Sequence, residues 1–337
     1  MLCTCQDGYE GLLERELKTA GASVSESGPG WVLCAQVPPG ELSPAFRDLT
    51  FAHRVLSEPV EVRGDSVNAL SRQILEYFAE ALRGERVEGS WPSLWGAPPE
   101  TVGLSRRAGA VERAFGEALS SRLSRVARLA SPETPWGVGP ARGLFVWFGG
   151  FDRAWVARTA WINGPRRMAD DPAAPSRSYL KVEEAYGIFG AEPSAGETVA
   201  DLGAAPGGWS YSAARHGARV VAVDNGPLKG AALGHPGIDH RRADAFGFRP
   251  AAGEVFDWLF CDLLEDPHHV LQDLVSPWVA GRWCRRLVVN LKFGRVDALG
   301  LLAELRAPGS PLSALSGLRI RHLFHDREEF TIAGRLE

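Results

Sequence analysis

Four side chains in the second half of the chain have the types and the placement needed for acid–base chemistry. Lys181 follows SRSYL in a stretch typical of a helix, Asp262 ends the apolar run VFDWLFCD, and Lys292 ends the run RRLVVNLK. Glu329, with Glu328 as the alternative, opens a further apolar run in HDREEFTI. Because the carboxyl ends of neighbouring parallel strands meet at one edge of a sheet, we expect these groups to share one site.

Two amines and two carboxylates suit the activation of a weakly acidic hydroxyl group. A lysine that is partly desolvated and close to another cation has a lowered pKa and can act as a base. Of the 37 basic residues, only Lys18, Lys181, Lys229 and Lys292 are lysines. A lysine inside a motif is therefore a candidate for proton transfer, which arginine cannot perform. The alternative for each residue taken singly is a surface ion pair.

The stretch TVADLGAAPGGWSYSAARHGARVVAVDN, residues 198–225, has the pattern of a strand, a glycine turn, a helix and a second strand. This order is half of a Rossmann-like unit. Asp201 ends the first apolar run and Asp224 ends the second, near the offset of about 20 residues at which an acid meets ribose hydroxyls. The turn residues are candidate cofactor contacts: Gly203, Ala205, Pro206, Gly207 and Gly208.

This turn suits an adenosyl ligand without phosphates. A pyrophosphate binds successive free N–H groups at a helix N-terminus, but Pro206 removes one donor and Asp201 adds a negative charge. S-adenosylmethionine carries ribose and adenine without phosphate, so we expect it as methyl donor, with Asp244 as a further acid at the same edge. Methyl transfer is an in-line displacement that depends on position. The four acid–base groups then indicate a ribose 2′-hydroxyl as acceptor, because a nitrogen or carbon nucleophile would not need them.

An α/β domain over residues 172–337 is expected to position these groups. Apolar runs predict strands at 197–202, 219–224, 237–241, 256–261, 286–291, 318–324 and 328–334. Helices are predicted at 176–189, 208–216, 228–233, 267–280 and 296–306. This alternation is typical of a Rossmann-like sheet, and we expect the last two strands to form an antiparallel pair that closes a mixed sheet.

The N-terminal half is predicted to hold two smaller α+β domains, 1–62 and 63–165. The first has strands at 2–5, 31–37 and 55–62, helices at 9–18 and 43–49, and turns at 28–30 and 38–40, which is ferredoxin-like. The second has helices at 66–82 and 111–129, a loop at 91–99, and a hairpin of strands 143–148 and 155–161. Helices and strands placed before a Rossmann-like domain suit an RNA-binding appendage. Arg122, Arg125 and Arg128 form a stripe that is either an RNA contact or a solvated face.

Residues 142–181 carry seven basic side chains and three acidic ones, in a chain whose net charge is −4. Trp155, Trp161 and Tyr179 lie among these bases. Such a stretch could neutralise phosphates and stack on nucleobases. The alternative is a basic linker between domains.

Composition excludes several classes of protein. The hydrophobic fraction of 45% is ordinary for a globular chain, and no apolar run approaches the roughly 18 residues of a membrane span. The N-terminus lacks the apolar core of a signal peptide, so we expect a cytoplasmic protein. The five cysteines form neither a disulfide framework nor a zinc site, and we expect no metal.

Six sequence blocks, APSRSYLKVEEA, DLGAAPGGW, VAVDNGP, CDLLEDP, NLKF and HDREEFT, resemble those of the bacterial 23S rRNA (cytidine-2′-O)-methyltransferase family, RlmM. More broadly, the domain is similar to FtsJ-type RNA ribose methyltransferases. The resemblance is specific over 172–335; over 1–160 it rests on element order and implies a ferredoxin-like unit plus a THUMP domain. It departs at Ala205, where the family has Cys.

The resemblance implies a Lys-Asp-Lys-Glu tetrad of Lys181, Asp262, Lys292 and Glu329, with Lys292 as proton acceptor. It also implies a monomer that uses S-adenosylmethionine and acts on 23S rRNA before large-subunit assembly, with no DNA or membrane partner. The family's cofactor contacts fall on Ser178, Ala205, Pro206, Gly207, Gly208, Asp224, Asp244 and Asp262.

Two other functions stay open on the residues alone. A non-catalytic RNA-binding or ribosome-assembly protein could retain a methyltransferase fold without needing the cofactor. A methyltransferase acting on a small molecule or a protein would not need the basic stretch at 142–181.

Overall fold

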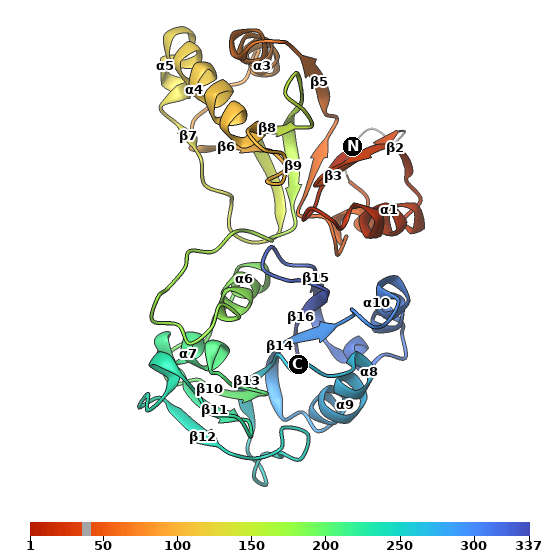
Figure 1. The fold of residues 1–337 in the computed structure, drawn as a ribbon, viewed down its shortest axis with the longest axis vertical. Coiled ribbons are helices and arrows are strands. Elements are labelled where there is room, and N and C mark those ends of the chain that lie inside the picture. Colours follow the sequence, from red (N-terminus) through yellow and green to blue (C-terminus); the bar gives the residue numbers. More distant parts are fainter. Residues whose placement is uncertain (36–41) are drawn as a thin grey trace. The chain divides into compact units, whose positions relative to one another are not determined.

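The computed structural model describes residues 1–35 and 42–337, which form two compact units, Met1–Gly164 and Pro165–Glu337 (Figure 1). The first unit contains both of the predicted N-terminal domains, and its subdivision into ferredoxin-like and THUMP-like parts stays a prediction. In the described residues, no helix has the length and the apolar character to cross a membrane.

The second unit is built on a seven-stranded sheet with the order β12-β11-β10-β13-β14-β16-β15. Strands β10 to β14 are parallel, and β16 pairs antiparallel with both β14 and β15, which confirms the predicted mixed sheet. The strands are β10 (Thr198–Leu202), β11 (Arg219–Val223), β12 (Ile238–Arg241), β13 (Phe256–Cys261), β14 (Cys284–Lys292), β15 (Ser316–Arg321) and β16 (Glu329–Arg335).

The strand order of this sheet reverses beside β10. The chain runs from β10 outward through β11 to β12, and then returns to place β13 on the other side of β10. In open α/β sheets, ligands bind outside the carboxyl ends of the strands at such a switch point. The loops that follow β10 and β13 are therefore where a ligand is expected, and both carry predicted site residues.

Helices pack on the sheet through apolar side chains. One core cluster joins α6 (Tyr179–Phe189) and α7 (Gly208–Arg215) to β10, β11 and β13, and it includes Trp258 and Phe260. The chain between β13 and β14 is an irregular helix, α8 (Pro267–His269), η2 (Val270–Val275) and α9 (Ser276–Ala280), in place of the single regular helix predicted at 267–280. The remaining helical elements are η1 (Gly230–Ala232), α10 (Ala298–Arg306) and η3 (Pro311–Ala314).

The first unit is a nine-stranded sheet with its own helices. The order is β2-β3-β1-β4-β9-β8-β6-β7, and β5 also pairs with β9. Its strands are β1 (Leu2–Thr4), β2 (Ser23–Gly28), β3 (Trp31–Ala35), β4 (Arg54–Ser57), β5 (Val60–Arg63), β6 (Trp91–Gly96), β7 (Ala130–Ser131), β8 (Gly139–Phe148) and β9 (Arg153–Ile162). Its helices are α1 (Glu10–Thr19), α2 (Pro44–Arg47), α3 (Val67–Ala81), α4 (Leu104–Arg122) and α5 (Ser124–Ala127).

The first unit differs from the prediction at three places. β2 was not predicted, because SVSESG is polar and mostly exposed. The predicted loop at 91–99 contains β6, which pairs in parallel with β8. The predicted strand at 55–62 is two strands, separated at Glu58, which has a φ of 46°. The predicted turn at 38–40 and the end of the strand predicted at 31–37 lie outside the described residues.

Candidate active site

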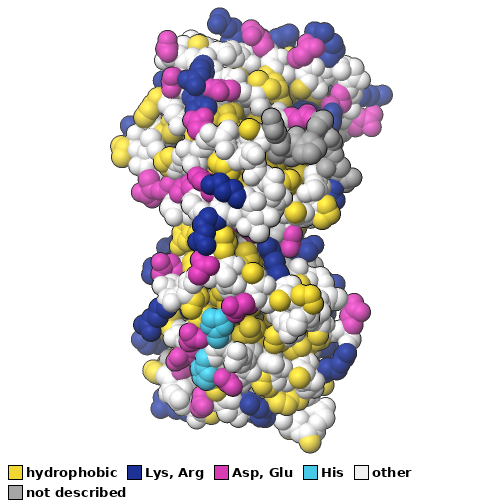
Figure 2. Space-filling model, turned by 90° about the vertical axis from the view of Figure 1, so that its right-hand side faces the viewer, with side chains coloured by type: hydrophobic (Ala, Val, Ile, Leu, Met, Phe, Trp, Pro, Cys, Tyr) yellow, Lys and Arg dark blue, Asp and Glu magenta, His cyan; other side chains and the backbone are white. Residues whose placement is uncertain are grey.

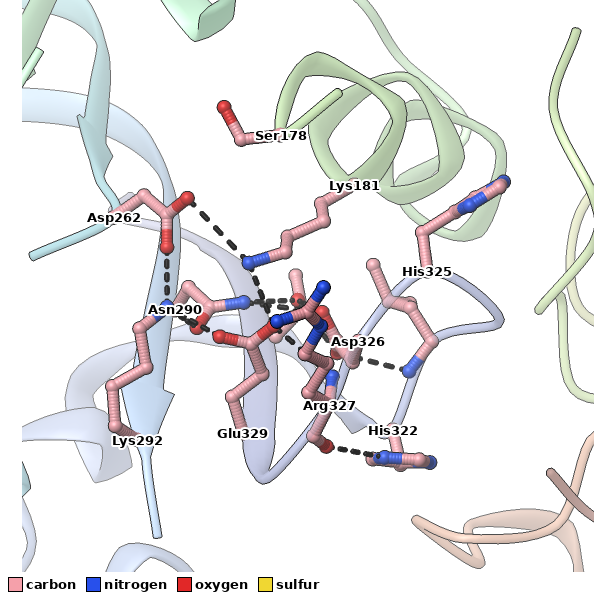
Figure 3. A network of polar contacts seen from close by, with 12 residues as sticks. Ser178, Lys181, Asp262, Asn290, Lys292, His322, His325, Asp326, Arg327 and Glu329 are labelled. Carbon is pink, nitrogen blue, oxygen red and sulfur yellow. Dashed lines mark hydrogen bonds and ion pairs between the residues drawn. The ribbon is translucent and has the colours of Figure 1, made fainter. Parts of the chain in front are cut away.

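The four predicted acid–base side chains converge on one point at the carboxyl edge of the second sheet (Figure 3). The Lys292 ammonium contacts the carboxylates of both Asp262 and Glu329. Lys181 Nζ lies 2.6 Å from Glu329 Oε1 and 3.6 Å from Asp262 Oδ2. Each carboxylate therefore faces both lysines, and the four charges balance.

Strand register explains why these residues meet. Lys292 is the last residue of β14 and Glu329 the first of β16, and the antiparallel register pairs them directly. Asp262 follows β13, the parallel neighbour of β14. Lys181 lies in the first turn of α6, which packs against β16. Glu328, the alternative to Glu329, is exposed and lies outside the cluster.

The expected lowering of the Lys292 pKa is wrong for this structure. Burial alone would lower it, but the carboxylates of Asp262 and Glu329 outweigh burial and raise the pKa above its ordinary value. Burial likewise would raise the pKa of Glu329, but Lys292 and Lys181 lower it. A second ammonium lies nearby as predicted, but two carboxylates at contact distance outweigh it. In this arrangement Lys292 is a hydrogen-bond donor.

A second layer of polar groups, which was not predicted from the sequence, contacts the cluster from the buried side. Lys292 Nζ donates to Asn290 Oδ1 at 2.5 Å, and Asn290 Nδ2 donates to Asp326 and Thr331. All three supporting residues are buried, and burial raises the pKa of Asp326 to about 8. One signal was available in NLK, because residues i and i+2 of a strand point to the same face.

A pocket of about 490 Å³ opens beside Lys292 and Glu329. Its remaining walls come from the loops that follow β13 and β14 and from the chain before β16, and its lining residues include Leu264, Glu265, Arg295 and Arg327. Lys292 and Glu329 therefore border a space that could admit part of a substrate.

The glycine turn after β10 is shaped by its own packing. Gly207 has a φ of +108°, and a Cβ there would lie 2.6 Å from the Cβ of Ala232. A Cβ on Gly208 would lie 2.7 Å from the hydroxyls of Ser176 and Ser178. Gly207 needs glycine for its backbone conformation and its close packing even without a ligand, and a side chain at Gly208 would require the two serine hydroxyls to move.

The acids predicted to contact the cofactor have different environments. The carboxylate of Asp224 is partly exposed and accepts from Ala205 N at 3.0 Å and Gly226 N at 2.6 Å, which fixes it beside the turn. Asp244 is exposed. Asp201 is 1% exposed and accepts from Ser210 Oγ at 2.6 Å, and burial raises its pKa to about 7. Its carboxylate therefore supports the turn from inside the domain.

The donor set at this edge fits S-adenosylmethionine. The turn with Gly203, Ala205 and Pro206 leads into α7 at Gly208, and Asp224 and Asp262 directly follow the strands on either side of β10. Carboxylates favour ribose hydroxyls and a positively charged sulfonium or ammonium group, and they disfavour phosphates. Ser178, the N-cap of α6, lies beside the turn, with its backbone carbonyl accepting from Trp209 Nε1 at 2.9 Å. In the described residues, no group of three or more His, Cys, Asp or Glu side chains is arranged to hold a metal ion.

The prediction that aromatic residues of 142–181 stack on nucleobases is wrong for two of the three. Trp155 is 1% exposed and packs on Trp31, and Tyr179 is 2% exposed. Most of the basic groups there are also neutralised: Arg142 and Arg158 pair with Glu85, Arg153 pairs with Glu26 and Glu61, and Arg177 pairs with Asp170. On the face shown in Figure 2, basic and acidic side chains are intermixed.

Comparison with known proteins identifies related methyltransferases. The FtsJ-like methyltransferase family model matches residues 174–283. Ribosomal RNA large subunit methyltransferase M of Xanthomonas oryzae pv. oryzae is 33% identical over 98% of both chains. The protein of the same name from Thauera aminoaromatica is 32% identical over 98% of this chain and 94% of its own.

Similarity to solved structures is looser. TrmN from Thermus thermophilus is 18% identical over 99% of each chain, with a TM-score of 0.36. The sequence relatives, by contrast, match at more than 30% identity along nearly the whole chain. The chain therefore belongs to the ribosomal RNA large subunit methyltransferase M family.

Proposed function

We propose that this protein transfers a methyl group from S-adenosylmethionine to a ribose 2′-hydroxyl, that of a cytidine, in 23S rRNA. The observation that carries the proposal is the meeting of two lysines and two carboxylates at the carboxyl edge of a Rossmann-like sheet, beside a pocket. Family membership supports the substrate, since the relatives are named as methyltransferases of large-subunit ribosomal RNA.

The cofactor would be held by the loops that follow β10, β11 and β13. Asp224 would accept from the ribose hydroxyls, and the backbone of residues 203–208 would approach the adenosyl group. Ser178, Asp244 and Asp262 complete the proposed contacts, with Asp201 supporting the turn from inside. When bound, S-adenosylmethionine supplies an electrophilic methyl group on a cationic sulfur.

The four clustered residues would position the nucleophile and take its proton. The carboxylates of Asp262 and Glu329 hold both ammonium groups in place. Lys292 would accept the hydroxyl proton, which requires that it first release one of its own protons to solvent water. Substrate entering the pocket would bring this about by displacing a carboxylate partner, since Lys292 loses its raised pKa when that contact is broken.

The substrate we propose is rRNA that has not yet been assembled into the large subunit, bound in the cytoplasm by a monomer. The first unit, with predicted ferredoxin-like and THUMP-like parts, would supply part of the RNA contact. Free rRNA leaves ribose 2′-hydroxyls accessible, and a pocket of about 490 Å³ would take a nucleotide only where the RNA chain can open locally.

The test is incorporation of labelled methyl groups into 23S rRNA from a strain that lacks the gene. We expect the wild-type protein to methylate this RNA at one ribose and Lys292→Ala to be at least about 100-fold slower, as expected for loss of a general base. Equal activity of the two proteins would refute the assignment of the base. Wild-type protein that binds the RNA but shows no heat of binding with S-adenosylmethionine would instead favour the non-catalytic RNA-binding alternative.

A further inference from the structure

Asn290 is a fully buried amide that contacts the proposed base. Its Oδ1 accepts from Lys292 Nζ at 2.5 Å, and its Nδ2 donates to Asp326 Oδ1 at 3.2 Å and to Thr331 Oγ1 at 3.1 Å. The oxygen and both N–H groups of the amide thus have partners (Figure 3). A buried amide satisfied on every side has one orientation, because any rotation leaves a donor facing a donor.

Asp326 determines which end of that amide faces Lys292. Its Oδ2 accepts from Leu323 N at 2.9 Å, and Thr331 Oγ1 donates to it at 3.0 Å. Asp326 Oδ1 accepts from Asn290 Nδ2 and also lies 3.2 Å from Thr331 Oγ1. Turning the amide over would end its N–H donation to Asp326 Oδ1 and would set its NH₂ against the ammonium of Lys292, which is unfavourable.

Lys292 has three acceptors for three ammonium protons, and Asn290 differs from the other two. Asp262 and Glu329 are carboxylates that can themselves take up a proton, and each also faces Lys181. Asn290 is neutral at every accessible pH and is held by buried partners. It can therefore keep one N–H direction of Lys292 fixed after the amine has lost a proton, so that the lone pair is directed toward the pocket.

We propose that Asn290 is a positioning residue for Lys292, and that Asp326 acts on Lys292 through Asn290 by fixing the orientation of the amide. The inference rests on the proposed role of Lys292 as the base. A pH dependence of this site also involves the other charged groups that face Lys292 or line its pocket, which are Lys181, Asp262, Glu265, Asp266, Arg295, Asp326, Arg327, Glu328 and Glu329.

The test measures kcat and KM for rRNA methylation across pH for Asn290→Leu, Asp326→Asn and the double variant. We expect Asn290→Leu to lower kcat by about 10- to 100-fold, as for a misplaced catalytic group, with the KM for RNA unchanged. The pH midpoint of kcat should also move to lower pH, because the ammonium loses an acceptor. Asp326→Asn should act similarly, since one of its polar atoms becomes a donor that faces the Asn290 amide.

The double variant distinguishes a positioning role of Asn290 and Asp326 from a merely structural one. If Asp326 acts through Asn290, Asp326→Asn should cause little further loss in the Asn290→Leu background. Thr331→Val keeps the shape of the side chain but removes the hydroxyl, and it should lower kcat and shift its pH midpoint in the same direction by a smaller amount. This variant replaces Asp326→Asn in the test if Asp326→Asn does not fold. Asp257→Asn is the matched control, because Asp257 also accepts from a threonine, Thr198, but at the opposite ends of the strands; it should leave kcat and the pH midpoint unchanged.

The inference is overturned if Asn290→Leu keeps the wild-type kcat and pH midpoint, or if the losses from Asn290→Leu and Asp326→Asn simply multiply. These outcomes differ from failure of the proposed function. If the proposed function fails, wild-type protein methylates no rRNA, or Lys292→Ala methylates it as fast as wild type does. Thermal unfolding and S-adenosylmethionine binding of each variant establish that it is folded.

Discussion

At the scale of single residues, the site depends on charge compensation. Two ammonium and two carboxylate groups are largely buried together. Removing any one of these four groups would leave an uncompensated charge in a largely buried site. The cluster therefore keeps Lys292 protonated in the free protein. If Lys292 is the base, its raised pKa predicts how the rate of methylation depends on pH.

We expect kcat/KM for rRNA methylation to rise by about tenfold per pH unit through the range from 7 to 9, with no plateau. The raised pKa of Lys292 leaves only a small neutral fraction there, and kcat/KM reports the free enzyme. Initial rates at low RNA concentration measure it, with RNA binding followed separately at each pH. A plateau that begins near pH 7 would show that the free amine is already neutral and would contradict this electrostatic description.

His322 predicts how stability responds to acid. Burial lowers its pKa from 6.5 to about 4, while its Nε2 donates to the carbonyl of Arg327 at 2.7 Å. The unfolded chain binds the proton more readily than the folded one, so stability is lost as pH falls from about 6.5 to 4, by up to about 3 kcal/mol.

Urea unfolding of wild type and His322→Gln at several pH values checks this expectation. The glutamine retains an N–H donor but does not titrate, so the free energy of unfolding of the variant should fall less steeply between pH 6.5 and 4. Parallel curves for the two proteins would mean that His322 is not responsible.

At the scale of elements, the segment between β15 and β16 must be held so that Glu329 faces the lysines. Glu184 on α6 is fully buried and accepts from Arg166 N and Phe324 N, each at 2.8 Å, and from His325 N at 3.2 Å. One carboxylate thus connects α6, the chain before it and the segment before β16. Lys181 lies one turn earlier on the same helix, so the contact also sets the distance between Lys181 and Glu329.

Glu184→Gln should lower the free energy of unfolding by about 1–3 kcal/mol. The NH₂ group of the glutamine would replace one carboxylate oxygen, so a buried backbone N–H that Glu184 accepts from would lose its acceptor. Methyl transfer should fall at temperatures where the variant is still folded. Glu183→Gln is the control on the same helix, since Glu183 contacts Ser212 and Arg215 instead, and its activity should stay near wild type. Equal losses of activity in both variants would argue against a specific role for Glu184.

The sequence was sufficient to predict the elements that bear the site, for a physical reason. Strands of a parallel sheet are buried on both faces and appear as continuous apolar runs, so VFDWLFCD and RRLVVNLK could be recognised and their polar last residues placed at one edge. Long-range partners could not be predicted in this way. Glu184 and Thr331 are buried polar residues that contact the segment between β15 and β16, which includes Asp326. Such contacts join residues far apart in the sequence, and no local sequence pattern indicates them.

At the scale of the whole molecule, RNA must be bound by a chain with a net charge of −4. Most arginines of the basic stretch at 142–181 are paired with carboxylates, so they contribute little net field. Arg122, Arg125 and Arg128 differ, because they are exposed at the end of α4 and along α5 and have no ion-pair partner among the described residues. They are the stronger candidates for phosphate contacts in the first unit.

Reversing all three charges, Arg122→Glu, Arg125→Glu and Arg128→Glu, should weaken binding to 23S rRNA and lower its salt dependence. Each phosphate contact that is lost reduces the slope of log K against log salt by about 0.7–0.9, so loss of all three should reduce the slope by about 2–3. Filter binding between 50 and 300 mM salt measures this, while S-adenosylmethionine affinity should not change. The control variant reverses the charges of Arg63, Arg83 and Arg86, which changes the net charge by the same amount. These three arginines are already paired with Glu61, Glu80 and Glu88. If both triple variants weaken binding equally, net charge and not this face governs the contact, and the stripe is a solvated surface.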